Sequence, residues 1–177
     1  NGIAPAFEAI AADADRVLAA KPGPPVLAYT SSPRGGLDRV LDAFRLLRGI
    51  RPDARIVVHS GFDHYPPDDP LRRDPGWLAI AAECASEPGM VWSGVVPQAR
   101  LADTLRNAAI LFYPNTIKET SCIAAMEAMA SGLAILTHPN GALPETLAGF
   151  GFLEPAPAGP SDVADGNRRF AAAAAAL

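Results

Sequence analysis

Two glutamates, Glu119 and Glu127, are the residues whose type and spacing first suggest chemistry. They stand eight positions apart, with only small or apolar residues between them. In a helix, at about 1.5 Å per residue, their carboxylates would lie about 12 Å apart along the axis. A general acid and base that act on one bond need carboxyl groups roughly 5–9.5 Å apart, so that role is disfavoured. Because carboxylates only accept hydrogen bonds, the pair suits hydroxyls at two ends of a long ligand, such as the sugar and the ribose of a nucleotide diphospho-sugar.

The segment around these glutamates predicts a helix whose start faces a ligand. Thr120 or Ser121 would be its N-cap, because a short hydroxyl side chain accepts from the free amides of the first turn. The N–H groups of residues 121–123 would point toward the carboxyl end of a predicted sheet and attract phosphate. Two plainer interpretations stay open: Glu119 as a complement to the helix dipole, and Glu127 as a solvated helix position.

Short apolar runs alternate along the chain with segments of helical period. The predicted strands are residues 26–30, 55–59, 91–93, 109–113, 133–137 and 151–153. The predicted helices are residues 37–47, 101–107, 121–131 and 161–177. Strands that are apolar throughout indicate a parallel sheet covered on both faces. The pattern therefore predicts an α/β fold, a doubly wound Rossmann-like parallel sheet of about six strands with helices on both faces.

In a fold of this kind, ligands bind at the carboxyl ends of the strands. The loops that follow the predicted strands there are residues 31–36, 60–77, 94–98, 114–120 and 138–144. The segment Gly61–Trp77 is rich in proline and aspartate, which is typical of a surface insertion.

Composition bounds the class of protein. The chain has 177 residues, 49% of them hydrophobic, and a net charge of −4, which suits one domain with an ordinary core. The mildly acidic balance and the lack of a dense basic run disfavour a nucleic-acid partner. No run of roughly 18–20 uncharged apolar residues would span a membrane. The first residue is Asn1, so we expect the chain to be a piece of a longer protein.

The cysteines and histidines carry no recognisable metal or disulfide pattern. Cys84 and Cys122 have no CxxC spacing, so we expect both to be reduced in a cytoplasmic protein. His59, His64 and His138 lack metal-ligand spacing, and we expect structural or solvent roles for them, with His138 in a ligand-facing loop. We expect no metal site.

Five stretches in order resemble a known family. They are the stretch N-G-I with Phe7, A-Y-T-S-S-P-R-G-G-L-D-R-V-L-D-A-F, V-W-S-G-V-V-P, E-T-S-C-I-A-A-M-E, and T-H-P-N-G-A-L-P-E with Gly141 and Glu145. Together they resemble the retaining GT-B glycosyltransferases of group 1, family four, whose E-x7-E motif is matched by Glu119 and Glu127. The resemblance covers residues 1 to about 150.

This resemblance implies the carboxy-terminal, donor-binding half of a two-domain enzyme. Residues 1–177 would form a single nucleotide-sugar-binding domain, with residues 1–7 as the remnant of an interdomain linker, and the amino-terminal acceptor domain would be absent. The activity implied is that of a hexosyltransferase, with a UDP- or GDP-sugar as donor, retention at the anomeric carbon and no permanent cofactor. The acceptor, a sugar, lipid or small molecule, would be held by the missing domain, as would any membrane contact. The fragment alone would be inactive.

The resemblance also implies roles for individual residues. Glu119 would contact the transferred sugar and Glu127 the ribose. The amides of Ser121, Cys122 and Ile123, at the helix start beside Thr120, would hold phosphate. Backbone groups of Val95 and Val96 would meet the base.

The phosphate loop departs from the family pattern. The family commonly has an arginine just after the first strand and a basic residue directly before the glycine, positions held here by Thr30 and Gly35. Arg34, displaced by one position, would then serve as the catalytic cation on the leaving diphosphate. Gly35 and Gly36 either allow close approach to phosphate or simply make the turn.

The sequence leaves two alternatives to a transferase open and disfavours a third. A nucleotide-sugar epimerase half would share the architecture. A degenerate, non-catalytic nucleotide-binding scaffold would fit the altered phosphate loop but not the intact glutamate pair. A dinucleotide oxidoreductase is disfavoured, because no G-x-G-x-x-G opens a helix after the first strand.

Overall fold

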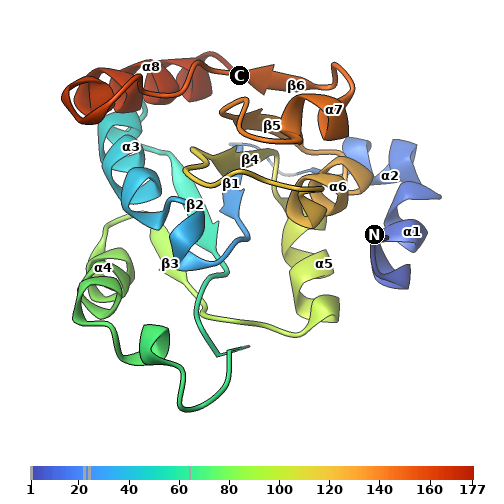
Figure 1. Cartoon of the computed structure of the whole chain (residues 1–177). Coiled ribbons are helices and arrows are strands. Elements are labelled where there is room, and N and C mark those ends of the chain that lie inside the picture. The colour runs from blue at the N-terminus through green and yellow to red at the C-terminus, as the bar shows by residue number, and fades with distance from the viewer. Residues whose placement is uncertain (1, 22, 24, 64) are drawn as a thin grey trace.

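The computed structural model describes residues 2–21, 23, 25–63 and 65–177, so Asn1 and His64 lie outside the described residues. Within them, six parallel strands form one sheet in the order β3-β2-β1-β4-β5-β6 (Figure 1). The strands are β1 Val26–Tyr29, β2 Arg55–Val58, β3 Met90–Trp92, β4 Ile110–Tyr113, β5 Ala134–Thr137 and β6 Gly151–Leu153. The strand order reverses between β1 and β4, which is the switch point where such folds bind ligands. The predicted doubly wound, Rossmann-like sheet is confirmed.

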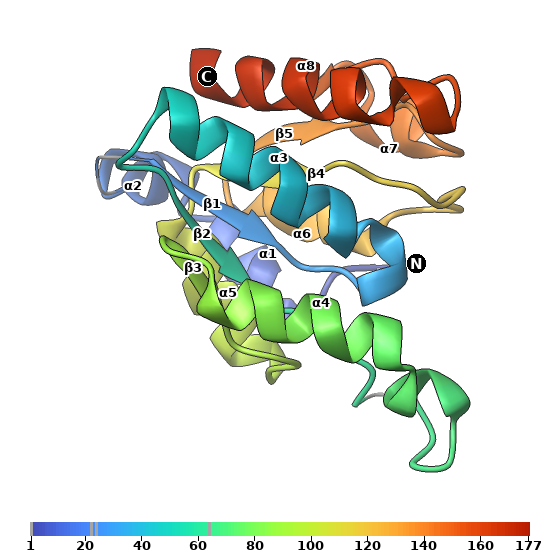
Figure 2. The same ribbon diagram turned by 90° about the vertical axis from the view of Figure 1, so that its left-hand side faces the viewer.

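Helices cover both faces of the sheet. One face carries α3 (Leu37–Ile50), α4 (Pro75–Ser86) and α8 (Val163–Ala176), and the other carries α1 (Pro5–Ala11), α5 (Gln98–Asn107) and α6 (Ile123–Ala130) (Figures 1 and 2). The shorter elements are α2 Ala14–Ala19, α7 Leu143–Leu147 and the 3-10 turns η1 Pro33–Gly35, η2 Pro70–Arg73 and η3 Pro160–Asp162.

Apolar patterning accounts for most of these elements. All four residues of β4 are buried, as expected for a central parallel strand. The predicted stripe of α3 is confirmed: its five apolar positions at helical spacing, Leu37, Val40, Leu41, Phe44 and Leu47, are all buried. On that same face Phe112 of β4 packs edge-on against Phe170 of α8, with ring centroids 5.0 Å apart. The core therefore fixes where each strand ends, and with it the loops at the carboxyl edge.

The predicted loop Gly61–Trp77 is wrong in its second half. There the chain forms η2 and the start of α4, which continues to Ser86. Asp69 and Asp74 cap these two elements, because their carboxylates accept from the amides of Leu71 and Trp77. Aspartate followed by proline was therefore a helix-start signal rather than a loop signal.

The first residues of the chain also form structure. Residues 5–7 of the expected linker lie in α1, whose Phe7 is fully buried. This helix packs against α5 and α6. Phe7 is thus part of the core of this domain.

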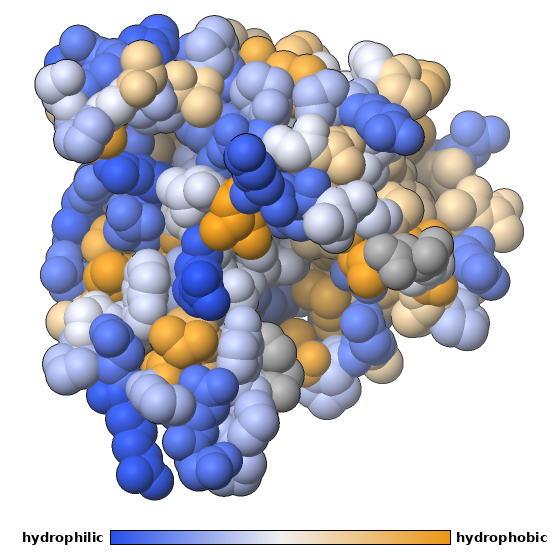
Figure 3. Space-filling model, viewed as in Figure 1, coloured by the Kyte–Doolittle hydropathy of each residue, from blue (hydrophilic) through white to orange (hydrophobic). Residues whose placement is uncertain are grey.

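The carboxyl ends of the strands face the viewer in Figure 1. The space-filling view of this side shows mostly polar side chains, with apolar ones in isolated groups (Figure 3). None of the helices formed by the described residues has the length and apolar character needed to cross a membrane.

Candidate functional site

Glu119 lies in an extended segment rather than in the helix that follows it. It forms a parallel bridge with Gly141, and its carbonyl accepts from the amide of Ala142 at 2.8 Å. Gly141 has a φ of 63°, and a Cβ built there would stand 2.2 Å from the Glu119 carbonyl oxygen. Only glycine fits this contact without displacing the backbone. The loop after β5 therefore holds Glu119 in place.

The carboxylate of Glu119 is oriented by a buried tyrosine. The hydroxyl of Tyr113, at the end of β4, donates to Oε1 of Glu119 at 2.5 Å and lies 3.4 Å from Oγ of Ser31. Burial and this hydrogen bond to a carboxylate raise the pKa of Tyr113 well above its usual range. Tyr113 therefore stays protonated and acts as a donor that fixes the carboxylate at the carboxyl edge of the sheet.

The predicted start of α6 is wrong. The helix begins at Ile123, its N-cap is Cys122 rather than Thr120 or Ser121, and no side chain caps it. Cys122 has a φ of 27°, a strained conformation for a residue with a side chain. Among the described residues, the amides of Ala125 and Met126 donate to a backbone carbonyl, but the amide of Ile123 does not. The helix therefore presents uncapped N–H groups, which are suited to an anion.

The position of Glu119 changes the spacing argument. Because Glu119 stands outside α6, the estimate of about 12 Å along one helix axis does not apply to the pair. Glu127 lies on the second turn of α6 and is 4% exposed, so the alternative of a solvated helix position is wrong. Desolvation raises the pKa of its carboxyl group.

Glu127 lines a cavity of about 290 Å³ at the switch point of the sheet, which we call the donor cavity. Its other lining residues come from the ends of β1 and β2, from the loop after β3 and from the starts of α5 and α6: Thr30, Ser31, Ser32, His59, Ser60, Gly61, Val95, Val96, Gln98, Leu101, Ile123 and Ala124. The predicted Val95, Val96, Ile123 and Glu127 thus converge on one cavity.

Three residues that line the donor cavity each have a buried side-chain atom without a partner. They are Oγ1 of Thr30, Nδ1 of His59 and Oγ of Ser60. Such groups cost free energy unless a ligand or water pairs with them. Sequence reasoning missed His59 and Ser60 as site residues. Both directly follow β2, and that position was the available signal.

The tautomer of His59 follows from its neighbours. Nε2 of His59 lies 2.8 Å from Oγ1 of Thr104, and that hydroxyl donates to the carbonyl of Arg100 at 3.1 Å. If Nε2 carries the proton, both contacts are satisfied and Nδ1 is left as an unpaired acceptor, which is less costly than a buried unpaired donor. Burial, with a smaller effect of the Arg100 charge, lowers the pKa of His59. His59 is therefore neutral and offers a lone pair.

The phosphate loop is shaped by close packing. A Cβ on Gly36, whose φ is 113°, would stand 2.5 Å from the carbonyl oxygen of Pro114, and one on Gly35 would stand 2.6 Å from Oγ of Ser31. Gly36 is thus required by the turn itself, whereas a side chain at Gly35 would have to displace the side chain of Ser31. Arg34 is exposed and does not line the donor cavity, although its carbonyl accepts from the hydroxyl of Thr116 at 3.1 Å. Within the described residues Arg34 forms no ion pair with Glu119 or Glu127.

Side chains that could ligate a metal ion do not cluster in the described part of the chain. No group of three or more His, Cys, Asp or Glu side chains within the described ranges could hold a metal ion. Cys122 is buried, and desolvation raises the pKa of its thiol to about 12, so it is not a nucleophile.

Comparison with known proteins agrees with this geometry. The model of a family described as "Glycosyl transferases group 1" matches residues 24–172. The chain therefore belongs to the glycosyl transferases group 1 family, and its sheet is that of one half of a GT-B glycosyltransferase. No significant match was found among curated protein sequences.

Several solved structures share the fold. The C-terminal domain of the group 1 glycosyl transferase LpcC from Francisella tularensis matches with a TM-score of 0.58 and 18% identity, over 96% of this chain and 89% of that domain. A glycosyltransferase from Rickettsia africae matches with a TM-score of 0.63 and 13% identity, over 99% of this chain and 50% of that protein. The pneumococcal O-GlcNAc transferase GtfA, solved in complex with UDP and GlcNAc, matches with a TM-score of 0.58 and 17% identity, over 89% of this chain and 29% of that protein.

Proposed function

We propose that this chain binds the nucleotide diphospho-sugar donor of a retaining hexosyltransferase. The observation that carries the proposal is the donor cavity, whose lining includes the buried carboxylate of Glu127, with Gln98 beside it, and His59, whose Nδ1 has no partner. A ribose supplies two hydroxyls and a base supplies N–H groups, so a nucleoside satisfies both acceptors. Family membership and the UDP complex of one structural relative support a UDP- or GDP-sugar.

Each predicted site residue has a part in this proposal. Glu127 binds the ribose, and backbone groups of Val95 and Val96 bind the base. The uncapped start of α6, at Ser121, Cys122 and Ile123 beside Thr120, binds the diphosphate, because its N–H groups and dipole favour an anion. Gly35 and Gly36 let the phosphate loop pack closely, with Gly36 against the carbonyl of Pro114 in the segment that leads to α6.

Two side chains act on the transferred sugar and the leaving group. The half-buried carboxylate of Glu119, fixed by Tyr113, contacts the sugar as it departs from the diphosphate. Arg34 is unpaired and long, so its guanidinium can swing onto the diphosphate and stabilise the charge that develops there. No metal is required for this arrangement.

The organisation of the whole protein belongs to the same proposal. Residues 1–177 serve as one nucleotide-sugar-binding domain, and a second domain completes the cleft, in line with the 50% share of the Rickettsia protein that the chain spans. Without that second domain the chain binds the donor but transfers little. The two free, buried cysteines favour a reducing, cytoplasmic location.

Calorimetric titration of the chain with UDP, GDP and ADP, and with their sugars, tests the proposal. We expect saturable binding of one nucleotide, and a loss of roughly 10- to 100-fold in affinity for Glu127→Gln, because a hydrogen bond to a charged group contributes about 1.5–3 kcal/mol. Glu145→Gln, on α7 and outside the donor cavity, is the matched control. Equal affinity of the wild type and Glu127→Gln would instead indicate the non-catalytic scaffold.

A further inference from the structure

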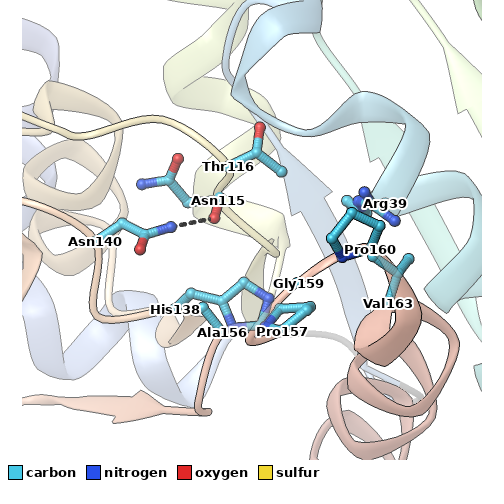
Figure 4. A pocket seen from close by; sticks show the side chains of 10 residues that line it. All are labelled: Arg39, Asn115, Thr116, His138, Asn140, Ala156, Pro157, Gly159, Pro160 and Val163. Carbon is cyan, nitrogen blue, oxygen red and sulfur yellow. Dashed lines mark hydrogen bonds between the residues drawn. The ribbon is translucent and has the colours of Figure 1, made fainter.

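A second, larger cavity lies at the carboxyl edge on the other side of the segment that carries Glu119. It encloses about 580 Å³, and we call it the outer cavity. Its lining comes from the first turn of α3, the loops after β4 and β5, and the approach to α8, as Figure 4 shows. It shares no lining residue with the donor cavity, and Glu119 lines neither.

His138 gives the outer cavity a neutral acceptor. Its ring is 4% exposed and packs against Phe170 with centroids 5.0 Å apart. Nδ1 lies 2.8 Å from the carbonyl oxygen of Glu154, and because a carbonyl only accepts, Nδ1 carries the proton. Burial lowers the pKa of His138, so the ring stays neutral and Nε2 keeps its lone pair. No group in the described ranges pairs with Nε2.

Asn140 adds a second acceptor, and its neighbour Asn115 holds it in place. Nδ2 of Asn140 donates to the carbonyl of Asn115, as the dashed line in Figure 4 shows, and this leaves Oδ1 of Asn140 as an acceptor. Asn115 is 1% exposed; its Oδ1 accepts from the amide of Ile117 at 2.8 Å, while Nδ2 is buried without a partner. Both amides are therefore oriented by the chain itself and keep one free end each.

Arg39 supplies the one formal positive charge among the described residues that line the outer cavity. Its Nε lies 3.5 Å from a carboxylate oxygen of Asp38, and the two side chains are 26% and 43% exposed. That pair is weak at such exposure, so the guanidinium keeps donors for a ligand. In Figure 4, Arg39 and Thr116 lie across the cavity from His138.

Apolar surfaces complete the wall. Ala156, Pro157, Pro160 and Val163 line the side toward α8. A pocket of this type, with apolar walls and a few oriented polar groups, binds a ligand that has a carbon face and several hydroxyls. A bare anion is disfavoured, because His138 and Asn140 present lone pairs and one arginine stands against them.

We propose that the outer cavity binds a saccharide unit of the acceptor, so that this domain holds part of the acceptor as well as the donor. Sugar hydroxyls both donate and accept, which matches the donors of Arg39 and the acceptors of His138 and Asn140. The assignment to an acceptor rests on the proposed function, whereas the preference for a hydroxyl-rich ligand rests on the cavity alone. Glu119 does not line this cavity, which sets the cavity apart from the place proposed for the transferred sugar.

The test is a titration of the chain with methyl glycosides of common hexoses, followed by backbone amide NMR shifts. We expect saturable shifts at residues 156–163, and at least about a fivefold weaker affinity for Arg39→Ala and Asn140→Ala. Arg51→Ala is the matched control, because Arg51 lies at the other end of α3 and pairs with Asp53 as Arg39 does with Asp38. UDP affinity should be the same in all three variants, and thermal melts check that each folds.

Three results would overturn the inference. One is the absence of saturable shifts with any glycoside. Another is binding of inorganic phosphate in their place, which would make the cavity an anion site. The third is shifts that arise only with a UDP-sugar and not with free glycosides, which would assign the cavity to the donor. Failure of UDP, GDP and ADP alike to bind would instead count against the proposed function, so the two failures are distinguishable.

Discussion

The hydroxyl of Tyr113 donates to the carboxylate of Glu119 across a distance of 2.5 Å. The two residues are six positions apart, at the end of β4 and in the extended segment that follows it. A charge-assisted bond of this kind is stronger than a neutral one and restricts the carboxylate to one orientation. The position of the most reactive side chain in the proposed site is therefore set by a residue of the central sheet.

Removing this hydroxyl should loosen Glu119 without removing it. We expect Tyr113→Phe to lower the free energy of unfolding by about 1.5–3 kcal/mol, measured by urea denaturation. It should also weaken the binding of the nucleotide-sugar more than the binding of the nucleotide alone, because only the sugar contacts Glu119 in the proposed complex. Tyr29→Phe is the comparison, since the Tyr29 hydroxyl donates to the carbonyl of Ser32 at 2.8 Å and not to Glu119. An unchanged ratio of the two affinities in Tyr113→Phe would contradict the role given to Glu119.

We expect the buried carboxylate of Glu127 to lower the free energy of unfolding at neutral pH, although it supports nucleotide binding. Because burial raises its pKa in the folded state, the folded chain holds this proton more tightly than the unfolded chain does. Its contribution to stability is therefore full below the unfolded pKa and is lost as pH rises through the folded pKa. We expect Glu127→Gln to be more stable than the wild type at pH 7 and equal to it at pH 4, in urea denaturation at both pH values. A variant that is less stable at pH 7 would show that the hydrogen bond from Gln98 outweighs the cost of burying the carboxylate.

His59 should make the fold sensitive to acid. Its pKa is lowered, first by burial, so the unfolded chain binds this proton more readily than the folded one. Stability is then present above the ordinary histidine pKa of about 6.5 and is lost as pH falls below it. We expect His59→Gln to lose part of the decline in melting temperature between pH 7 and pH 5. His138, whose pKa burial also lowers, should supply much of the rest, so the double variant is the decisive sample. A decline of full size in that double variant would assign the acid sensitivity to other groups.

Gly141 should be far more sensitive to substitution than another glycine of similar conformation. Gly141→Ala places a Cβ 2.2 Å from the Glu119 carbonyl, whereas Gly149 has a φ of 88° with nothing within 4 Å of its Cβ position. Gly149→Ala therefore measures the backbone strain alone, about 1 kcal/mol. We expect Gly141→Ala to cost about 2 kcal/mol more than that, because the bridge to Glu119 must also open. Equal losses in the two variants would mean that the bridge contributes little.

The sheet was predictable because its signal is local. The apolar runs that became β1, β4 and β5 are buried on both faces, so they read as strands without knowledge of their neighbours. The stripe of α3 was equally plain. By contrast, α4 was not predicted from the sequence. Asp74 and Pro75 are a helix-start signal, but the proline-rich segment before them suggested a loop.

The detail of the site depended on contacts between distant residues. Glu119 follows a strand and precedes a helix, and its bridge to Gly141, in the loop after β5, decides where that helix begins. His59 and Ser60 gave no motif, because the lack of a partner for a buried atom is a property of the folded chain and not of residue spacing. The charge of Arg34 predicts a role on the diphosphate, and the structure leaves its side chain exposed, so that role stays a prediction.

The bond from the Ala142 amide to the Glu119 carbonyl has a practical consequence. This amide proton can exchange with solvent only when the loop after β5 parts from the Glu119 segment. Its exchange rate therefore reports how often the glutamate is out of place, in the resting chain and without any substrate. Slower exchange on addition of a nucleotide-sugar, compared with the nucleotide alone, would register sugar contact in a protein that has not yet been given an acceptor.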